Sequence, residues 1–155
     1  MSSIRSAARA LIVRRDKILL TRCRRDGQEF YVLPGGGQQE VETLEEAVIR
    51  ECREEIGVEV EVRGLCFVRD YIPAPGAFSY LDVSEAKHQV EHFFECDVPA
   101  GYEPEKGSEP DPLQVSVEWL GVEALSGGRV YPPGLERVLA GEPLDSLPVY
   151  WRETG

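Results

Sequence analysis

Several stretches of the chain are apolar or alternate between hydrophobic and polar residues, as β-strands do. In residues 8–22 two short apolar stretches meet at Arg15 and Asp16, which predicts a hairpin. A glycine at position 64 interrupts a longer alternating stretch and indicates a β-bulge. The stretches that predict strands are residues 8–22, 58–72, 87–98 and 115–120, the last of them being the final strand.

Turn residues separate these strands. A polar turn around Asp26 and Gly27 leads into FYVLPGGG, a brief strand that Pro34 and three glycines stop. Residues 73–86 predict a loop, and residues 101–112 predict a second one, rich in proline and acid. The second loop is long enough to suggest a function of its own.

One segment, TLEEAVIRECREEIG, carries a strong helix signature. Thr43 followed three residues later by Glu46 forms a capping box, and Gly57 stands where a left-handed C-cap residue belongs. A shorter helix is predicted in residues 132–141, with one apolar face made of Leu135, Val138 and Leu139. Strands outnumber helices, so the pattern predicts an α+β fold or a mixed sandwich.

Length and composition predict a single domain over residues 1–155. The chain is 42% hydrophobic and 29% charged, which is ordinary for a globular protein. Its N-terminus is basic and then apolar, like a secretory signal, but charged residues from Arg14 to Lys17 interrupt the apolar run. No apolar run approaches the ~20 residues of a membrane span, so we expect no membrane association.

The four cysteines show no two-residue spacing typical of a zinc ribbon or a redox motif. They indicate isolated buried thiols in a reducing cytoplasm. The net charge of −11 argues against binding to extended nucleic acid, which needs a basic stripe. An acidic protein can still bind a phosphate-rich small molecule if a metal ion supplies positive charge.

The helix concentrates its acidic residues on one side. At about 100° per residue, Glu51, Glu54 and Glu55 fall within an arc of roughly 100°. This arc borders the apolar arc formed by Val48, Cys52 and Ile56. One interpretation is a solvated acidic face with local ion pairs to Arg50 or Arg53, each worth a few tenths of a kcal/mol.

Two features favour a site instead. Acidic groups are disfavoured near a helix C-terminus, yet Glu54 and Glu55 occupy the last turn. Converging carboxylates beside an apolar surface suit a hard cation such as Mg²⁺ or Mn²⁺. Other sites fit poorly, because the glycines lack P-loop and dinucleotide-binding spacing, and His88 and His92 are predicted to be ordinary strand residues.

The segment from Gly36 to Val58 resembles the Nudix box, the signature of the Nudix hydrolase superfamily. A glycine is followed after five residues by Glu42 and after seven more by RECREEIGV, which begins at Arg50. Cys52 is the one departure, because an aliphatic residue is usual there. YVLPGGG before the box and EWL near residue 119 extend the similarity.

The resemblance implies a Nudix fold, a mixed sheet sandwiched by helices with a catalytic loop-helix-loop. It implies hydrolysis of a nucleoside diphosphate linked to another moiety, with Mg²⁺ or Mn²⁺. By position, Glu51, Glu54 and Glu55 would bind the metal, together with the backbone carbonyl of Gly35. Arg50 and Glu42 would form a bracing ion pair, and Gly36 and Gly57 would be structural.

The remaining roles stay open. Candidates for the general base are a glutamate of the box or one of four later acids: Glu91, Glu95, Glu109 and Asp111. Candidates for substrate contact are Arg22, Arg24, Arg25, Tyr31, Glu91 and Asp111, with Tyr71, Phe78 and Tyr80 able to stack on a base. Each of these side chains is also typical of an ordinary surface or core position.

Two competing hypotheses remain beside the hydrolase. One is a Nudix fold kept as a nucleotide-binding or regulatory module without catalysis, and the other is an acidic interaction domain. Pro73, fifteen residues after the box, resembles a proline of ADP-ribose pyrophosphatases. The sequence does not identify the substrate. It also does not decide between a monomer and a homodimer.

Overall fold

Two mixed β-sheets form the centre of the computed structural model, which describes residues 3–76, 78–81 and 87–152. In the first sheet β1 runs parallel to β7, while the other neighbours are antiparallel. Its strands, in spatial order, are β5 (Gly35–Gly37), β1 (Arg5–Leu11), β7 (Gln89–Asp97) and β6 (Glu61–Tyr71).

The second sheet is built around β3 (Lys17–Arg25). Along one edge β3 pairs with β2 (Val13–Arg14) and β4 (Gln28–Val32), and along the other with β8 (Gln114–Leu120). A short parallel strand, β9 (Val130–Tyr131), extends the sheet beyond β4.

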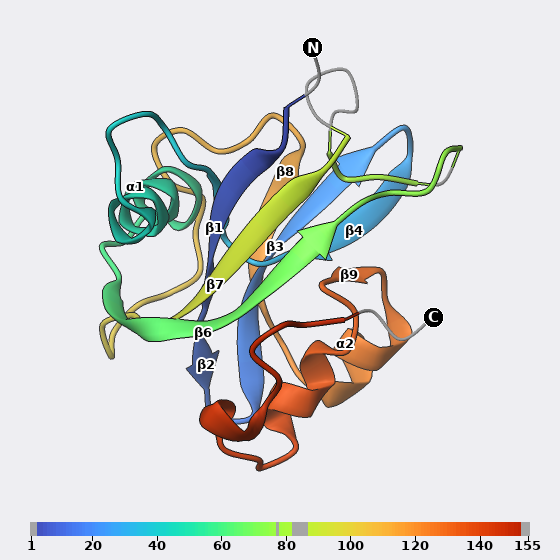
Figure 1. The fold of residues 1–155 in the computed structure, drawn as a ribbon. Coiled ribbons are helices and arrows are strands. Elements are labelled where there is room, and N and C mark those ends of the chain that lie inside the picture. Colours follow the sequence, from blue (N-terminus) through green and yellow to red (C-terminus); the bar gives the residue numbers. More distant parts are fainter. Residues whose placement is uncertain (1–2, 77, 82–86, 153–155) are drawn as a thin grey trace.

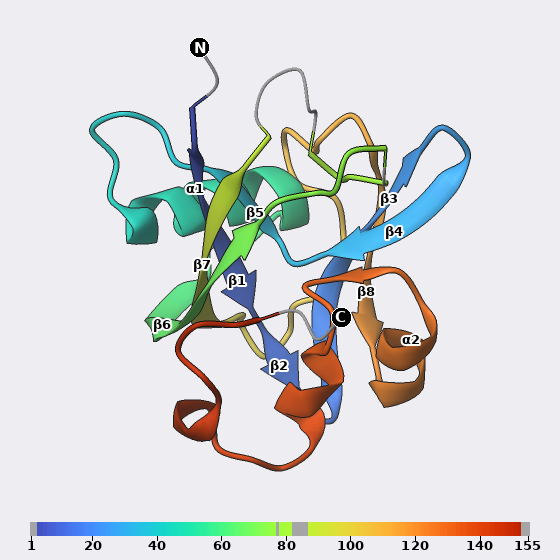
Figure 2. The ribbon, with the colours of Figure 1, turned by 45° about the vertical axis from the view of Figure 1, so that its right-hand side comes forward.

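Helices cover the sheets from two sides (Figures 1 and 2). On one side α1 (Leu44–Ile56) packs Ala47, Val48, Cys52 and Ile56 against Ala8, Ala10 and Leu19. On the other side, Leu11, Ile18 and Leu20 meet a C-terminal group of short helices. These helices are α2 (Val122–Gly127), η1 (Leu135–Leu139) and η2 (Leu144–Ser146). Neighbouring residues of a strand point to opposite faces of the sheet. The buried strands β1 and β3 therefore contribute side chains both to the core under α1 and to the core under the C-terminal helices. The predicted α+β fold is confirmed.

Local chain reversals follow the sequence signals. Arg15 has φ 49° in the β2–β3 turn, and Asp26 and Gly27 have φ 50° and 78° in the β3–β4 turn. The β6–β7 ladder shifts register between Val62 and Gly64, which confirms the predicted bulge.

The structure corrects four expectations. Gly35–Gly37 is itself a strand, paired with β1, because backbone pairing needs no side chains. The strand at 114–120 is not the last, since β9 follows it. Residues 135–139 form a 3₁₀ helix, bounded by left-handed Gly134 and Gly141. His88 precedes β7 rather than lying in it. The loop predicted at 73–86 lies partly outside the described residues.

The cysteines are free thiols; Cys23, Cys52 and Cys96 are buried as predicted, whereas Cys66 is only half-buried. Among the helices of the described residues, none combines the length and apolar character needed to cross a bilayer.

Candidate active site

Helix α1 begins and ends at the residues its caps specify. The Glu46 amide donates to Thr43 Oγ1 and the Thr43 amide donates to Glu46 Oε1, both at 3.1 Å. Gly57 ends the helix with φ 70°. These local contacts fix which residues fall in the last turn, and therefore where Glu54 and Glu55 project.

Arg50 links the helix to the segment before it. Its guanidinium donates from Nε to Glu42 Oε2 at 2.7 Å and from Nη2 to Glu42 Oε1 at 3.1 Å. The same Nη2 donates to the Gly37 carbonyl at 3.0 Å. This two-pronged contact holds the pKa of Glu42 below its usual range. The Arg50–Glu42 ion pair is thus present and ties α1 to the segment before it, and the Gly37 contact ties α1 to β5.

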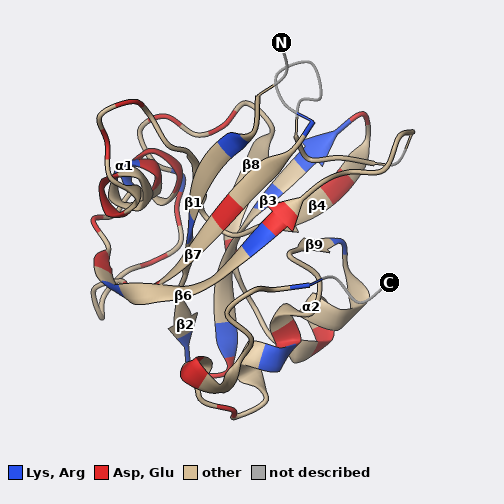
Figure 3. Ribbon diagram, in the orientation of Figure 1, with Lys and Arg blue, Asp and Glu red and all other residues tan. Residues whose placement is uncertain are grey.

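The third nitrogen of Arg50 lies between two acidic residues. Nη1 is 2.9 Å from Glu51 Oε1 and 3.3 Å from Glu54 Oε2. One cation therefore offsets the repulsion within the acidic cluster. Figure 3 shows the acidic positions (red) gathered on α1 and the loops beside it.

Glu55 lies in a different environment, with only 8% of its surface exposed. The Gly35 amide donates to its Oε1 at 3.1 Å. Burial raises the pKa of Glu55 to about 8, against the opposing effect of the Arg9 cation. Burial removes water from the Glu55 carboxylate, and a bound cation could take the place of that water in stabilising the negative charge.

Gly36 permits the close approach of helix and strand. A Cβ at this position would lie 2.7 Å from Glu51 Cδ, closer than atoms can pack. A glycine is needed there if the Glu51 carboxylate is to stay against β5.

Residues 101–112, here named the capping loop, bind the C-terminal carbonyls of α1. The Gly107 amide donates to the Glu55 carbonyl at 3.1 Å, and the Glu109 amide donates to the Glu54 carbonyl at 3.0 Å. Tyr102 Oη donates to the Ile56 carbonyl at 2.7 Å. From β8, Gln114 Nε2 adds a bond to the Glu55 carbonyl at 2.8 Å. The loop thereby supplies the partners that the last helical turn lacks.

A cavity of about 220 Å³ opens beside these residues. Its charged lining divides into acidic and basic groups: Glu51, Glu55 and Asp111, and Arg5, Arg9 and Arg25. Gly35 and Gly36 also line it, together with Gln114 and side chains of β3 and β4. Two of the three predicted metal-binding glutamates therefore border the same cavity as the predicted Gly35.

Several predicted substrate contacts lie elsewhere. Thr21 and Cys23 of β3 line the cavity, so the intervening Arg22 and its neighbour Arg24 project from the opposite face. Both arginines pair with Glu29, at 2.5 and 2.8 Å. Tyr31, opposite Arg22 in the β3–β4 register, is on that outer face as well. Of the three neighbouring arginines, only Arg25 reaches the cavity.

The four later acids considered as general base lie in different parts of the structure. Glu91 is 2% exposed, and its carboxylate accepts from Arg9, Arg69, Tyr80 and Gln89. Burial opposes ionisation, but the two arginines hold the pKa of Glu91 below its usual value. Asp111 lines the cavity, and the backbone of Glu109 contacts Glu54. Glu95 lines a second cavity together with Cys66.

The aromatic and histidine candidates mostly pack internally. Tyr71 and Tyr80 stack on each other with ring centroids 4.3 Å apart, and Phe78 packs edge-on to Phe30 at 5.2 Å. His88 contacts Asp70 at 2.7 Å, and His92 contacts the Ala7 carbonyl at 2.9 Å.

Sequence reasoning missed Arg5, Arg9 and Gln114 as lining residues. For Arg9 a signal existed, because it interrupts the apolar run ARALIV and yet is only 7% exposed. A charged residue inside a buried strand has a partner or a function.

The donors of a metal site are present, although Arg50 now occupies two of them. Within the described part of the chain, no group of three or more His, Cys, Asp or Glu side chains has the arrangement of a metal site. Arg50 Nη1 lies 2.9 Å from Glu51 Oε1 and 3.3 Å from Glu54 Oε2. Carboxylate and carbonyl oxygens are nevertheless the donors that Mg²⁺ and Mn²⁺ prefer.

The chain is an α+β domain in which an acidic helix is held against a short glycine strand. Comparison with known protein families identifies the family that has these features. The NUDIX domain model matches residues 4–138. The chain therefore belongs to the NUDIX family. No curated protein matches it.

Solved structures agree with this assignment. A MutT NUDIX hydrolase from Burkholderia pseudomallei is 27% identical, with TM-score 0.67, over 90% of this chain and 99% of that one. A NUDIX hydrolase from Nitrosomonas europaea is 18% identical, with TM-score 0.63 and coverages of 92% and 83%. An ADP-ribose pyrophosphatase from Streptococcus suis is 22% identical, with TM-score 0.59 and coverages of 89% and 88%. The last two show the shared fold alone.

Proposed function

We propose that this NUDIX domain is a metal-dependent hydrolase that cleaves a pyrophosphate linkage in a nucleoside diphosphate linked to another moiety. The observation that carries the proposal is the complete set Glu51, Glu54 and Glu55, held on one helix beside Gly35 and an open cavity. Residues 1–155 would form a single catalytic domain, working in the cytoplasm as a monomer or homodimer.

The three glutamates and the Gly35 carbonyl would hold Mg²⁺ or Mn²⁺. When bound, such an ion lowers the pKa of a water and neutralises phosphoryl oxygens during displacement. The buried Glu55 fits this donor set, because a cation would compensate for the hydration that its carboxylate lacks.

Other residues of the chain position these donors. Arg50 holds α1 against β5 through Glu42 and Gly37, and the Gly35 amide orients the Glu55 carboxylate. Asp111 is our preferred general base, since it is exposed and lines the cavity. Glu91 is already bonded to four donors, so we assign it a structural role.

A catalytically silent Nudix module is the alternative. Intact glutamates argue against it, because a binding module that performs no hydrolysis does not need them. Pyrophosphate binding without turnover, in the presence of either metal, would favour the alternative.

A hydrolysis screen tests the proposal. Nucleoside triphosphates, ADP-ribose, NADH, dinucleoside polyphosphates and nucleotide sugars are incubated with Mg²⁺ or Mn²⁺, and products are identified in ¹⁸O-labelled water. We expect metal-dependent cleavage of at least one compound, with the label locating the attacked phosphorus. No cleavage of any compound with either metal would contradict the proposal.

A further inference from the structure

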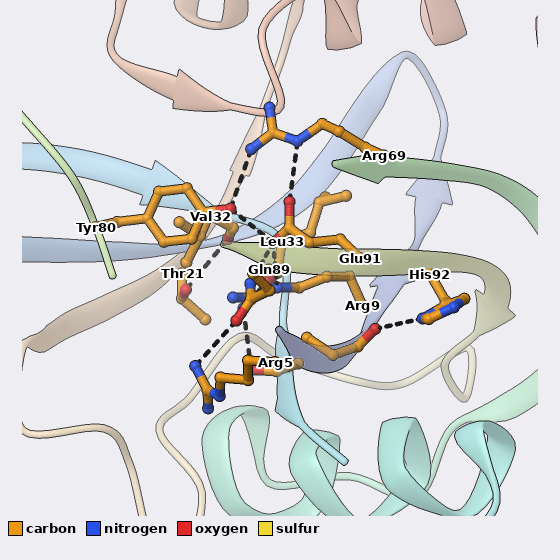
Figure 4. A network of polar contacts seen from close by, with 12 residues as sticks. Arg5, Arg9, Thr21, Val32, Leu33, Arg69, Tyr80, Gln89, Glu91 and His92 are labelled. Atoms are coloured by element: carbon orange, nitrogen blue, oxygen red, sulfur yellow. Dashed lines mark hydrogen bonds and ion pairs between the residues drawn. The ribbon is translucent and has the colours of Figure 1, made fainter. Parts of the chain in front are cut away.

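Arg9 is the most deeply buried cation that lines the cavity. It is 7% exposed and lies in a polar network between β1, β6 and β7 (Figure 4). Its Nε donates to Glu91 Oε2 at 3.2 Å. Its Nη1 donates to the carbonyls of Leu33 at 3.2 Å and Gly35 at 3.0 Å. These bonds hold the guanidinium in place in the lining of the cavity.

The network around Glu91 makes this position rigid. Arg69 donates to Glu91 Oε1 at 3.0 Å, and Tyr80 and Gln89 donate to Oε2 at 2.6 and 2.9 Å. Within the described residues Glu91 is the carboxylate at ion-pair distance from Arg9, and Arg9 shares it with three other donors. A buried cation with a shared counter-ion retains a strong attraction for further negative charge.

One nitrogen of the Arg9 guanidinium, Nη2, is available to bind a ligand. Nη2 has no hydrogen-bond partner within the described residues, while Nε and Nη1 are both occupied. Among buried side-chain nitrogens and oxygens of the described residues, only Gln114 Oε1 is enclosed without a partner. Nη2 is therefore not sealed in the protein interior, and the cavity that Arg9 lines gives access to it.

Two further arginines line the same cavity. Arg5 donates from Nη1 to Gln89 Oε1 at 3.0 Å, which connects it to the same network. Arg25 donates from Nη1 to the carbonyls of Ser79 and Leu81 at 2.5 and 3.1 Å. These hydrogen-bond partners are neutral, and within the described residues neither guanidinium is at ion-pair distance from a carboxylate.

The rest of the lining disfavours recognition of a nucleobase by stacking. Of the aromatic residues that line the cavity, Phe30 is 2% exposed and Tyr80 already stacks on Tyr71 at 4.3 Å. The volume of about 220 Å³ is also below the roughly 300–1,000 Å³ typical of sites that hold a whole ligand. The cavity thus suits compact charged groups such as phosphates rather than a nucleobase.

We infer that Arg9, with Arg5 and Arg25, forms an anion subsite for a substrate phosphate outside the hydrolysed linkage. The inference rests on the proposed function and narrows its substrate class. A nucleoside triphosphate or another nucleotide with an additional phosphate fits, whereas a nucleotide sugar with a neutral sugar does not. The acidic side of the cavity and the arginine side then engage separate phosphates of one molecule.

Binding of inorganic phosphate in EDTA tests the subsite without any catalysis. Titration calorimetry is run on the wild type, on Arg9→Lys and Arg25→Gln, and on Arg63→Gln as control. Arg63 is an exposed arginine that lines a different cavity. We expect each cavity variant to weaken phosphate binding by about tenfold or more, the loss of one charge-assisted hydrogen bond, and the control to match the wild type. Arg9→Lys retains the charge next to Glu91, so its fold should persist, which circular dichroism verifies.

Kinetics with ATP and ADP-glucose then test the substrate class. We expect the wild type to prefer ATP by at least about tenfold in kcat/KM, and both cavity variants to lose this preference through KM. Wild type that binds no phosphate, variants that bind it normally, or equal use of both compounds would overturn the inference. Failure to hydrolyse any compound would instead overturn the proposed function, while phosphate binding would still report on the subsite.

Discussion

Glu51, Glu54 and Glu55 occupy different environments although they lie within one and a half turns of α1. The Glu51 and Glu54 side chains are 14% and 26% exposed, and both contact Arg50. Glu55 is buried and bonded to the Gly35 amide. Because desolvation and ion pairing act differently on each, we expect their substitutions to have unequal effects on folding.

Glu54→Gln should separate catalysis from stability. The side chain is the most exposed of the three, so an isosteric amide should leave the thermal midpoint nearly unchanged. If the proposed function holds, metal-dependent turnover should fall by orders of magnitude, because the proposed metal site would lose a charged ligand. Glu45→Gln, in the exposed first turn of α1, is the control. Near-normal kinetics of Glu54→Gln would rule out its role as a metal ligand.

The cysteine thiols should be unreactive in the folded protein. Burial raises the pKa of Cys23 and of Cys66 to about 11, and that of Cys96 to about 12. The thiolate is the nucleophile, so modification by a disulfide reagent at neutral pH should be slow. After denaturation all four thiols should react rapidly. Rapid labelling of the native chain would contradict the assigned burial.

At the scale of elements, the capping loop resolves the conflict between the acidic last turn and the helix dipole. Backbone amides of Gly107 and Glu109 bind carbonyls of α1, so the negative end of the helix is hydrogen-bonded. A Cβ at Gly107 would lie 2.2 Å from the Arg53 carbonyl oxygen, so the loop can approach only through a glycine.

Gly107→Ala should therefore displace the loop from the helix. We expect a loss of unfolding free energy of about 1–3 kcal/mol in urea titrations, as for other overpacked positions. Metal affinity should weaken as well, because Glu54 and Glu55 lie in the turn that the loop supports. Gly101→Ala is the matched control, since a Cβ there meets nothing within 4 Å. Equal stability of the two variants would show that the loop can move at no cost.

The success of sequence-based prediction differed between elements for physical reasons. Helix α1 was predictable because Thr43, Glu46 and Gly57 specify its ends through contacts between near neighbours. The strand at Gly35–Gly37 was missed, because its pairing with β1 depends on residues about 28 positions away. The arginine side of the cavity was missed for the same reason, since Arg9 is explained by its distant partner Glu91.

The predicted substrate contacts Arg22, Arg24 and Tyr31 lie outside the cavity for a related reason. Period-two alternation assigns them to the face opposite Thr21 and Cys23, but the sequence alone does not indicate which face borders the cavity. The motif pointed to the acidic residues that line the cavity, whereas the arginines on its opposite side are identified only from the fold.

At the scale of the whole molecule, the C-terminal segment secures the edge of the first sheet. The Val68 amide donates to the Val149 carbonyl, and the Trp151 amide donates to the Val68 carbonyl, both at 2.8 Å. Trp151 is 2% exposed and packs on Phe67 with ring centroids 4.6 Å apart. This indole joins β6 to the core beneath η1.

Trp151→Ala should destabilise the entire domain. Loss of a buried aromatic side chain costs about 3–5 kcal/mol, which is a large part of the stability of a domain of this size. We expect a clear fall in the thermal midpoint, while Val149→Ala, at a position 73% exposed, should stay close to the wild type. A similar midpoint for both variants would show that the segment contributes little to folding.

The capping loop also has a consequence for protein engineering. Its Gly107 and Glu109 contacts with α1 are made by backbone amides, and the Glu103, Lys106 and Ser108 side chains are exposed. Those three positions can accept many residue types without disturbing the helix that carries the glutamates. A library restricted to them would vary the surface beside the C-terminal end of α1, where Lys106 and Ser108 lie near Arg53 and Gly57, while the helix itself stays in place.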